Sequence, residues 1–191
     1  SFEQVRWAHL EGNHSTGTGY YFPEENTEIQ VCRGETTGNW KDIGMFEGES
    51  TENYLEMWVD HGKNPDNASY SYVLLPETSV EETENYVREP KITILENSSK
   101  VQAVYHRKLG ITGINFWQEQ GGSIGGITSD KAASVMLQET AKGTLKISVS
   151  DPTMKNQGEI RIMLGKDTVL IFRMAGKNGR SCLAELPIHS I

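Results

Sequence analysis

Apolar residues recur at every second position in several short segments of this chain. The pattern occupies residues 55–59, 101–105, 145–149 and 160–164, where apolar residues alternate with mostly polar neighbours. Successive side chains of a β-strand point to opposite faces, so a period of two predicts strands that each turn one face toward a core. Residues 168–174 are dense enough in apolar side chains to predict a strand in the centre of a sheet.

Turn-forming sequences separate the predicted strands at short intervals. They are HGKNPDN at 61–67, SDPTMKNQG at 150–158, LGKD at 164–167 and AGKNGR at 175–180. Gly, Asn, Asp and Pro favour the backbone conformations of tight turns, so each segment can join two neighbouring strands. Short strands at this spacing, without long helices between them, predict an all-β fold in which antiparallel sheets stack as a β-sandwich.

One helix is predicted, over residues 79–88. Thr78 or Ser79 can cap its N-terminus, because a hydroxyl at this position accepts a hydrogen bond from the first turn. Two glutamates follow in that first turn, where negative charge is favourable. Pro90 comes directly after the segment and prevents the helix from continuing.

Pro90 also marks a change in composition. Three of the four tryptophans and six of the seven tyrosines precede it, whereas the later strands consist mainly of Val, Ile and Leu. We therefore expect two β units, residues 1–89 and residues 90–191.

Charge and hydropathy exclude several classes of partner. The chain has 191 residues and a net charge of −8, so it repels phosphate, and neither nucleic acid nor an anionic membrane is expected to bind. Its apolar runs are far shorter than the about 20 residues of a membrane-spanning helix. Because the chain begins with Ser1 and runs at once into a strand-like segment, we expect a processed piece of a longer polypeptide.

Cys32 and Cys182 lie far apart in the sequence, which does not suggest a metal knuckle or a redox pair. The favoured interpretation is two free, buried thiols, and the alternative is a single disulfide between them. The five histidines are scattered without the spacing of a zinc site, so no metal ligand is predicted. The acidic clusters are typical of solvated surfaces.

Two further segments resemble functional sites, a proton-transfer site and a phosphate-binding loop, but are better explained as loops between strands. Asn13, His14 and Tyr20 form a set that could handle protons, yet their surroundings, EGNHSTGTG, are typical of a turn between strands at 2–9 and 19–22. The glycine-rich segment 121–130 lacks the spacing of a phosphate-binding loop and is predicted to be a flexible hairpin loop. No catalytic residue is predicted from either segment.

The most suggestive pair for binding is Arg33 with Trp40, in the segment VCRGETTGNWKDI. An exposed indole ring can pack on a sugar face, and a guanidinium can form two hydrogen bonds to a carboxylate. The alternative is that Trp40 anchors the core and Arg33 is a charge at the end of a strand.

Four sequence blocks resemble a known family. They are WAHLEGNHSTGTGYYFP at 7–23, RGETTGNWKDI at 33–43, VDHGKNPDNASYSYVLLPETS at 59–79 and ITILENSSKVQAV at 92–104. Their order and spacing are similar to those of the C-terminal β region of family 8 polysaccharide lyases, which includes hyaluronate, chondroitin AC and xanthan lyases.

This resemblance implies that residues 1–89 are the last part of a large central β-sandwich and residues 90–191 a smaller C-terminal one. Members of the family cleave uronic-acid-containing polysaccharides by β-elimination, and their catalytic residues lie in an N-terminal helical toroid. The resemblance therefore implies a non-catalytic piece of a secreted bacterial enzyme, without a cofactor. Its expected partners are the acidic polysaccharide and the toroid of the same enzyme.

The resemblance also implies that Arg33 and Trp40 contact substrate, since members often carry an arginine shortly before a Gly-x-Trp in this region. The spacer GETT is longer here than in the usual pattern. Two alternatives stay open. One is a stand-alone carbohydrate-binding sandwich that uses exposed aromatic residues such as Trp40, Trp58 or Trp117, and the other is a purely structural sandwich with all aromatic residues in its core.

Overall fold

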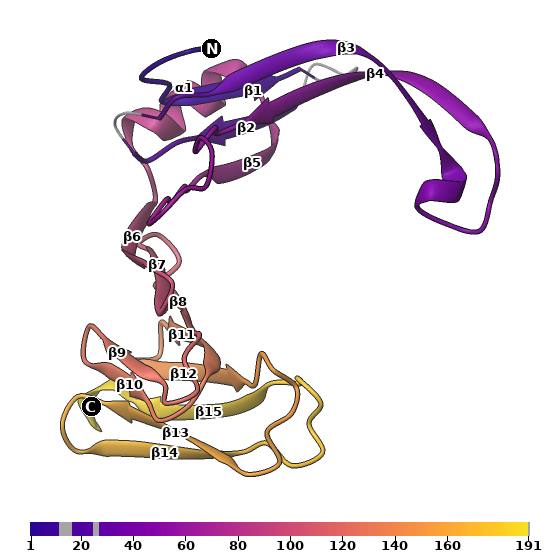
Figure 1. The fold of residues 1–191 in the computed structure, drawn as a ribbon. Coiled ribbons are helices and arrows are strands. Elements are labelled where there is room, and N and C mark those ends of the chain that lie inside the picture. The colour runs from indigo at the N-terminus through magenta and orange to yellow at the C-terminus, as the bar shows by residue number, and fades with distance from the viewer. Residues whose placement is uncertain (12–16, 25–26, 191) are drawn as a thin grey trace. The chain divides into compact units, whose positions relative to one another are not determined.

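A computed structural model describes residues 1–11, 17–24 and 27–190 and divides the chain into two compact units, Ser1–Glu89 and Pro90–Ile191 (Figure 1). All strand pairs in the described part of the chain are antiparallel. The predicted all-β, antiparallel sandwich class is confirmed. In that same part, no helix is long and apolar enough to cross a membrane.

The first unit contains a three-stranded sheet and one helix. The sheet has the order β1 (Trp7–Leu10), β2 (Gly17–Tyr21), β5 (Val73–Thr78). Helix α1 (Val80–Arg88) packs so closely on this sheet that a Cβ atom at Gly19 would lie 2.3 Å from the Thr83 hydroxyl. A side chain at position 19 would therefore separate the helix from β2.

The start of α1 agrees with the prediction. Ser79 is the N-cap: its hydroxyl accepts a hydrogen bond from the Glu82 backbone N–H at 3.2 Å, and the Glu82 carboxylate accepts one from the Ser79 backbone N–H at 2.8 Å. This reciprocal pair satisfies two backbone donors that the helix leaves unpaired. The same hydrogen bonds from the Ser79 backbone and side chain lower the pKa of Glu82.

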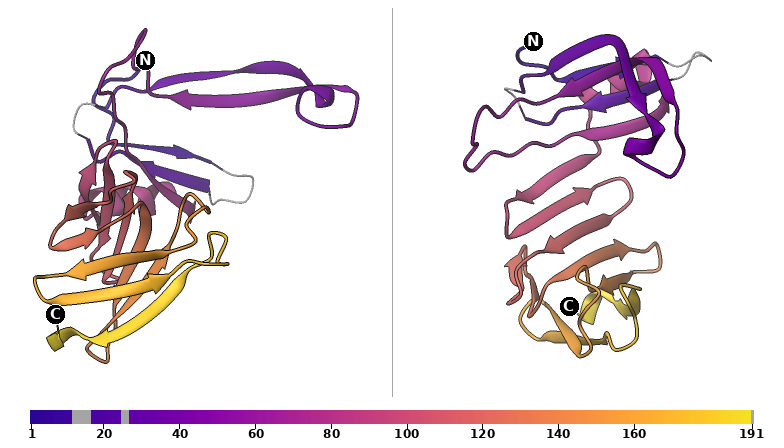
Figure 2. Two further views of the ribbon diagram at one scale, coloured as in Figure 1. Left: turned by 60° about the horizontal axis from the view of Figure 1, so that its bottom comes forward. Right: turned by 45° about the vertical axis from the view of Figure 1, so that its right-hand side comes forward.

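A long two-stranded ribbon completes the first unit. Strands β3 (Gln30–Asn39) and β4 (Glu49–Trp58) pair along their whole length, and a short 3-10 helix, η1 (Trp40–Asp42), lies at the far end. Figures 1 and 2 show this ribbon extending away from β1, β2 and β5. Most of its side chains are exposed on both faces.

The second unit is a sandwich of two sheets. The six-stranded sheet has the order β15-β12-β11-β8-β7-β6, and the four-stranded sheet has the order β14-β13-β10-β9. The strands are β6 (Ile92–Asn97), β7 (Val101–His106), β8 (Ile111–Phe116), β9 (Gly122–Ile124), β10 (Ile127–Ser129), β11 (Ala133–Glu139), β12 (Thr144–Ser150), β13 (Glu159–Leu164), β14 (Thr168–Arg173) and β15 (Cys182–Pro187). A last 3-10 turn, η2, covers Ile188–Ser190.

The core of the second unit lies between its two sheets. Phe116 and Ile147 from the larger sheet and Ile160 and Ile162 from the smaller one are fully buried in one cluster. Ile147, Ile160 and Ile162 belong to the period-two segments, so the alternation there correctly predicts which side chains enter the core. The predicted turns at 61–67, 150–158, 164–167 and 175–180 also join strands, although Ser150 and Leu164 still belong to the strands that they end.

The strand predicted at 168–174 is present, but its predicted place in the centre of a sheet is wrong. Strand β14 lies at the edge of its sheet, not in its centre. Phe172 is buried, but Val169 and Ile171, on the opposite face, are about half exposed. The dense apolar run therefore indicates β propensity and not burial on both faces.

Two other strands are present, but their ends differ from the predicted ones. The first strand begins at Trp7 and not at residue 2, because Gln4 has a φ of 55°, which interrupts an extended backbone. The second begins at Gly17 and ends at Tyr21, against a prediction of 19–22.

The glycine-rich segment 121–130 is more ordered than a flexible loop. It forms the hairpin β9–β10, and β10 pairs with β13 inside the four-stranded sheet. The turn needs two residues with positive φ, which Gly125 and Gly126 supply at +54° and +80°.

The cysteine prediction is half right. Both thiols are free, but Cys32 is exposed on the ribbon and Cys182 is only partly buried. Cys32 is not buried because nothing in the described part of the first unit covers that stretch of β3.

Candidate functional site

Arg33 lies within β3, opposite Leu55, and not at the end of a strand as the sequence suggested, because the strand continues to Asn39. Its side chain is exposed. Within the described residues the guanidinium has no hydrogen-bond or ion-pair partner. It is therefore available to bind a carboxylate, for which it offers parallel N–H donors.

Trp40 begins the short η1 turn at the end of β3 and is 54% exposed. Asn39 holds this turn in place, since its side-chain oxygen accepts hydrogen bonds from the backbone N–H of Lys41 at 3.0 Å and of Gly48 at 3.4 Å. The alternative that Trp40 anchors the core is wrong, because more than half of this residue is exposed.

The structure does not bring Arg33 and Trp40 together at one point. Arg33 and Asn39 are six residues apart on an extended strand, which rises about 3.3 Å per residue, so about 20 Å separates them. One sugar ring cannot contact both side chains. Any ligand that used the pair would be a chain lying along the ribbon.

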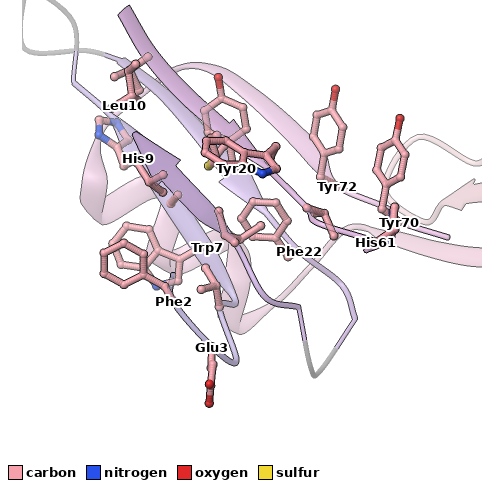
Figure 3. A pocket seen from close by; sticks show the side chains of 18 residues that line it. Phe2, Glu3, Trp7, His9, Leu10, Tyr20, Phe22, His61, Tyr70 and Tyr72 are labelled. Atoms are coloured by element: carbon pink, nitrogen blue, oxygen red, sulfur yellow. The ribbon is translucent and has the colours of Figure 1, made fainter. Parts of the chain in front are cut away.

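A large open groove lies in the first unit, and the sequence analysis missed it (Figure 3). Its volume is about 970 Å³, and its walls come from β1, β2, the base of the β3–β4 ribbon and the segment before β5. Trp7, Phe22, Ile29, Met57 and Trp58 are among the lining residues, so the groove is mainly apolar.

Tyrosine rings form a row along this groove. Tyr70 and Tyr72 stack with ring centroids 6.4 Å apart, Tyr20 lies 6.4 Å from Tyr72, and His61 lies 6.1 Å from Tyr70 (Figure 3). The alternation SYSY at 69–72 was the signal that could have predicted two of these rings on one face.

The segment with Asn13, His14 and Tyr20, which the sequence predicts to be a turn and not a catalytic set, is only partly described by the structure. Asn13 and His14 lie outside the described residues, whereas Tyr20 lies in the groove as a member of the aromatic row. Another groove residue, His9, has its Nε2 atom 2.8 Å from the Thr78 carbonyl oxygen. A carbonyl only accepts, so Nε2 carries the proton and donates it.

The remaining tryptophans occupy different surroundings. Trp58 lines the groove, and Trp117 lies in the second unit at the end of β8; they are 44% and 46% exposed. The Trp117 indole N–H donates a hydrogen bond to the Gln102 side-chain oxygen at 3.1 Å, and the Gln102 amide donates to Asn97 at 3.3 Å. These bonds fix the ring orientation of Trp117.

The carboxyl groups with shifted pKa values serve turns and caps. Besides Glu82, Asp151 is shifted: burial acts to raise its pKa, but hydrogen bonds from Asn156, Thr153 and Lys155 together lower it. Asp151 accepts from the Thr153 hydroxyl at 2.7 Å and from the Asn156 backbone N–H at 2.8 Å. Among the described residues, no group of His, Cys, Asp and Glu is arranged to hold a metal ion.

Comparison with known sequences adds independent information. Residues 1–87 match the family description "Polysaccharide lyase family 8, super-sandwich domain", and residues 93–159 match "Polysaccharide lyase family 8, C-terminal beta-sandwich domain". The chain is 45% identical over 168 residues to the xanthan lyase of Bacillus sp. (strain GL1), covering 85% of this chain and 18% of that protein. It is 36% identical over 152 residues to the hyaluronate lyase HylB of Enterococcus faecalis, covering 78% and 15%.

Solved structures agree with the sequence matches. The Paenibacillus xanthan lyase superposes with a TM-score of 0.83 and 34% identity, covering 96% of this chain and 20% of that one. The chain therefore spans only 15% to 20% of the length of these relatives.

Proposed function

Because the chain belongs to polysaccharide lyase family 8, we propose that it is the non-catalytic β-sandwich part of a polysaccharide lyase secreted by a bacterium. The observation that carries this proposal is the match of two consecutive domains of one family, with 45% identity to a xanthan lyase. Residues 1–89 then form the last part of the central sandwich and residues 90–191 the small C-terminal one.

The proposed reaction is β-elimination on a uronic-acid-containing polysaccharide: xanthan, hyaluronan or chondroitin. A base removes the proton at C5 of the uronate, a double bond forms between C4 and C5, and the 4-linked oxygen leaves with a proton. Negative charge develops at the uronate carboxylate, so a cation or amide must stabilise it there. The proposal assigns these groups to the helical toroid of the same polypeptide and no catalytic role or cofactor to this chain.

The role proposed for this chain is to support the toroid and to form one wall of the substrate cleft. The exposed guanidinium of Arg33, which has no partner among residues 1–11, 17–24 and 27–190, supports this role, because it suits a sugar carboxylate. Trp40, further along the ribbon, offers an exposed ring to an apolar sugar face. Their separation along β3 suits an extended acidic polymer better than a single sugar.

Lyase assays test the division of roles. The purified chain alone should give no rise in the absorbance of unsaturated uronate on xanthan, hyaluronan or chondroitin, whereas the intact enzyme that contains it should. Turnover by the isolated chain at the rate of the intact enzyme would overturn the proposal. Recovery of the intact enzyme from the culture medium, and not from cells, tests secretion.

Substitution of Arg33 tests the cleft wall. In the intact enzyme, Arg33→Ala should lower kcat/KM by about 10- to 150-fold, which corresponds to the loss of a charge-assisted hydrogen bond of about 1.5 to 3 kcal/mol. Arg173→Ala, which removes an 88% exposed arginine side chain from β14, is the control and should have no effect. Unchanged turnover in Arg33→Ala would favour a purely structural sandwich.

A stand-alone carbohydrate-binding sandwich is the second candidate. The observation that favours it is the half-exposed Trp117 ring, which Gln102 holds in a fixed orientation. Calorimetry separates the two functions: a binding module should bind oligosaccharides as the isolated chain, whereas one wall of a cleft should bind them poorly. Loss of that heat in Trp117→Ala would locate the binding site on the second unit.

A further inference from the structure

The tip of the β3–β4 ribbon carries an unusual concentration of exposed apolar side chains. Ile43 is 80% exposed, Met45 97% and Phe46 79%. Single apolar residues on a surface are common, but three large ones within four positions of one projecting turn are not. Such a patch is typical of a surface that another polypeptide covers.

The tip is held in one shape before any partner arrives. The Trp40 backbone N–H donates to the Gly48 carbonyl at 3.0 Å, and Lys41 and Glu47 form an ion pair of 2.9 Å across the turn. Asn39 caps the short helix, as described above. Gly48 has a φ of 141°, a conformation that glycine adopts readily. Preorganisation lowers the entropy that binding costs.

The ribbon behind the tip also lacks cover. A hairpin of two strands is marginally stable in water unless a further strand or a helix packs on it. In the described part of the chain, β3 and β4 pair only with each other, and almost all their side chains are exposed. Both the ribbon and its tip would therefore be stabilised by a polypeptide surface that covers their exposed side chains.

We propose that this apolar tip, residues 43–46, inserts into an apolar recess on the part of the lyase polypeptide that lies outside this chain, and that Trp40 stays outside the recess. The inference rests on the proposed function, which makes the chain one part of a longer enzyme. About four-fifths of the Paenibacillus xanthan lyase chain lies outside the matched region, so a large partner surface is available on the same polypeptide.

The size of the patch favours a covalently linked partner over a free one. Three side chains of these sizes offer on the order of 500 Å², below the roughly 800 Å² per partner of a stable interface between separate proteins. A contact this small holds only when linkage keeps the partner at a high effective concentration, in the millimolar range. A second copy of this chain does not meet that condition.

Oxidation of Met45 measures the burial of the tip directly. Its thioether reacts with hydrogen peroxide when exposed, and the product is read by mass spectrometry of the digested protein. In the isolated 191-residue chain, Met45 should react as fast as free methionine added to the same sample. In the intact lyase it should react at least about tenfold more slowly, since reaction then requires the tip to leave its recess. Equal rates in the two proteins would overturn the proposal.

A pair of matched variants tests the contact itself. Phe46→Ser in the intact lyase should restore Met45 oxidation to within about twofold of its rate in the isolated chain, because it removes a large apolar side chain from the recess. Leu183→Ser removes an equally exposed apolar residue, 79%, from the second unit and should leave Met45 protected. Full protection in Phe46→Ser would also overturn the proposal.

Two further measurements test the docking of the tip and the proposed lyase function separately. Lyase activity of the intact protein on xanthan, hyaluronan and chondroitin tests the proposed function, whatever the state of Met45. An active enzyme with unprotected Met45 would reject the docking alone, and an inactive one with protected Met45 would reject the function alone. A concentration-dependent dimer of the isolated chain in sedimentation, abolished by Phe46→Ser, would assign the tip to a second copy and reject the proposed partner.

Discussion

The two compact units bury their apolar residues to different extents. In the second unit, Phe116, Ile147 and Ile160 are fully buried between two sheets that cover each other. In the first unit, Tyr21, Phe22 and Ile29 are buried, but Leu55 and Trp58 remain about half exposed along an open groove. A unit with a closed core can be stable alone, whereas one with an open apolar face gains stability when something covers it.

Substitution in the closed core should have the largest effect. Ile160→Ala removes methyl groups from a fully buried site and leaves a cavity, so it should lower the free energy of unfolding of the second unit by about 3 to 4 kcal/mol. Leu55→Ala, at a half-exposed position of the first unit, should cost less than about 1 kcal/mol. Urea unfolding, monitored separately for each unit, measures the free-energy loss caused by each substitution. Equal losses would show that the units do not differ in the way their exposures indicate.

The contact between α1 and β2 tests whether the first unit also contains a tightly packed region. Gly19→Ala places a Cβ atom against Thr83, which is fully buried, and should lower the stability of this unit by about 1 to 3 kcal/mol. Gly34→Ala, on the open ribbon, meets no atom within 4 Å and is the control. Thermal unfolding followed by circular dichroism measures both. A harmless Gly19→Ala would mean that α1 moves away easily.

Acid should affect the two shifted carboxyl groups unequally. The pKa of Asp151 is lower in the folded protein than its ordinary value of 3.8, so its contribution to stability is complete above pH 3.8 and is lost as the pH falls through the lower, folded value. Asp151→Asn should therefore flatten the loss of stability of the second unit between about pH 5 and pH 2. Glu82, in α1 of the first unit, is fully exposed, and Glu82→Gln should change the corresponding curve of the first unit less. Urea midpoints at several pH values test this, and identical curves for Asp151→Asn and the unsubstituted chain would contradict it.

The comparison also explains which sequence-based predictions succeeded. Period-two alternation correctly predicts the strands that contain Ile147 and Ile160, because both sheets of the second unit have one face in the core. The helix and its cap at Ser79 were predicted because capping involves residues three apart, a local interaction. In the first unit the same alternation at 55–59 correctly predicts a strand but not a fully buried face, since Leu55 stays about half exposed.

For the candidate site, the exposed tryptophan and the arginine were identified from residue type alone. Their separation was not, because VCRGETTGNWKDI does not show that β3 runs straight through Arg33 to Asn39. The assignment of substrate binding to Arg33 and Trp40 stays a prediction. The aromatic row of Tyr20, Tyr70 and Tyr72 was missed because its members come from two segments about 50 residues apart in sequence.

The amino-acid sequence by itself determined the all-β class, the positions of most strands and turns, the capped helix and the family, since all of these depend on local spacing or on blocks of matching residues. Only the tertiary structure decided that β14 is an edge strand, that the glycine-rich segment is a sheet hairpin, and that a groove and an apolar tip remain uncovered in the first unit. The reason is that edge position and exposure depend on which distant segments pair and pack, and local alternation is the same whether or not a partner covers the face.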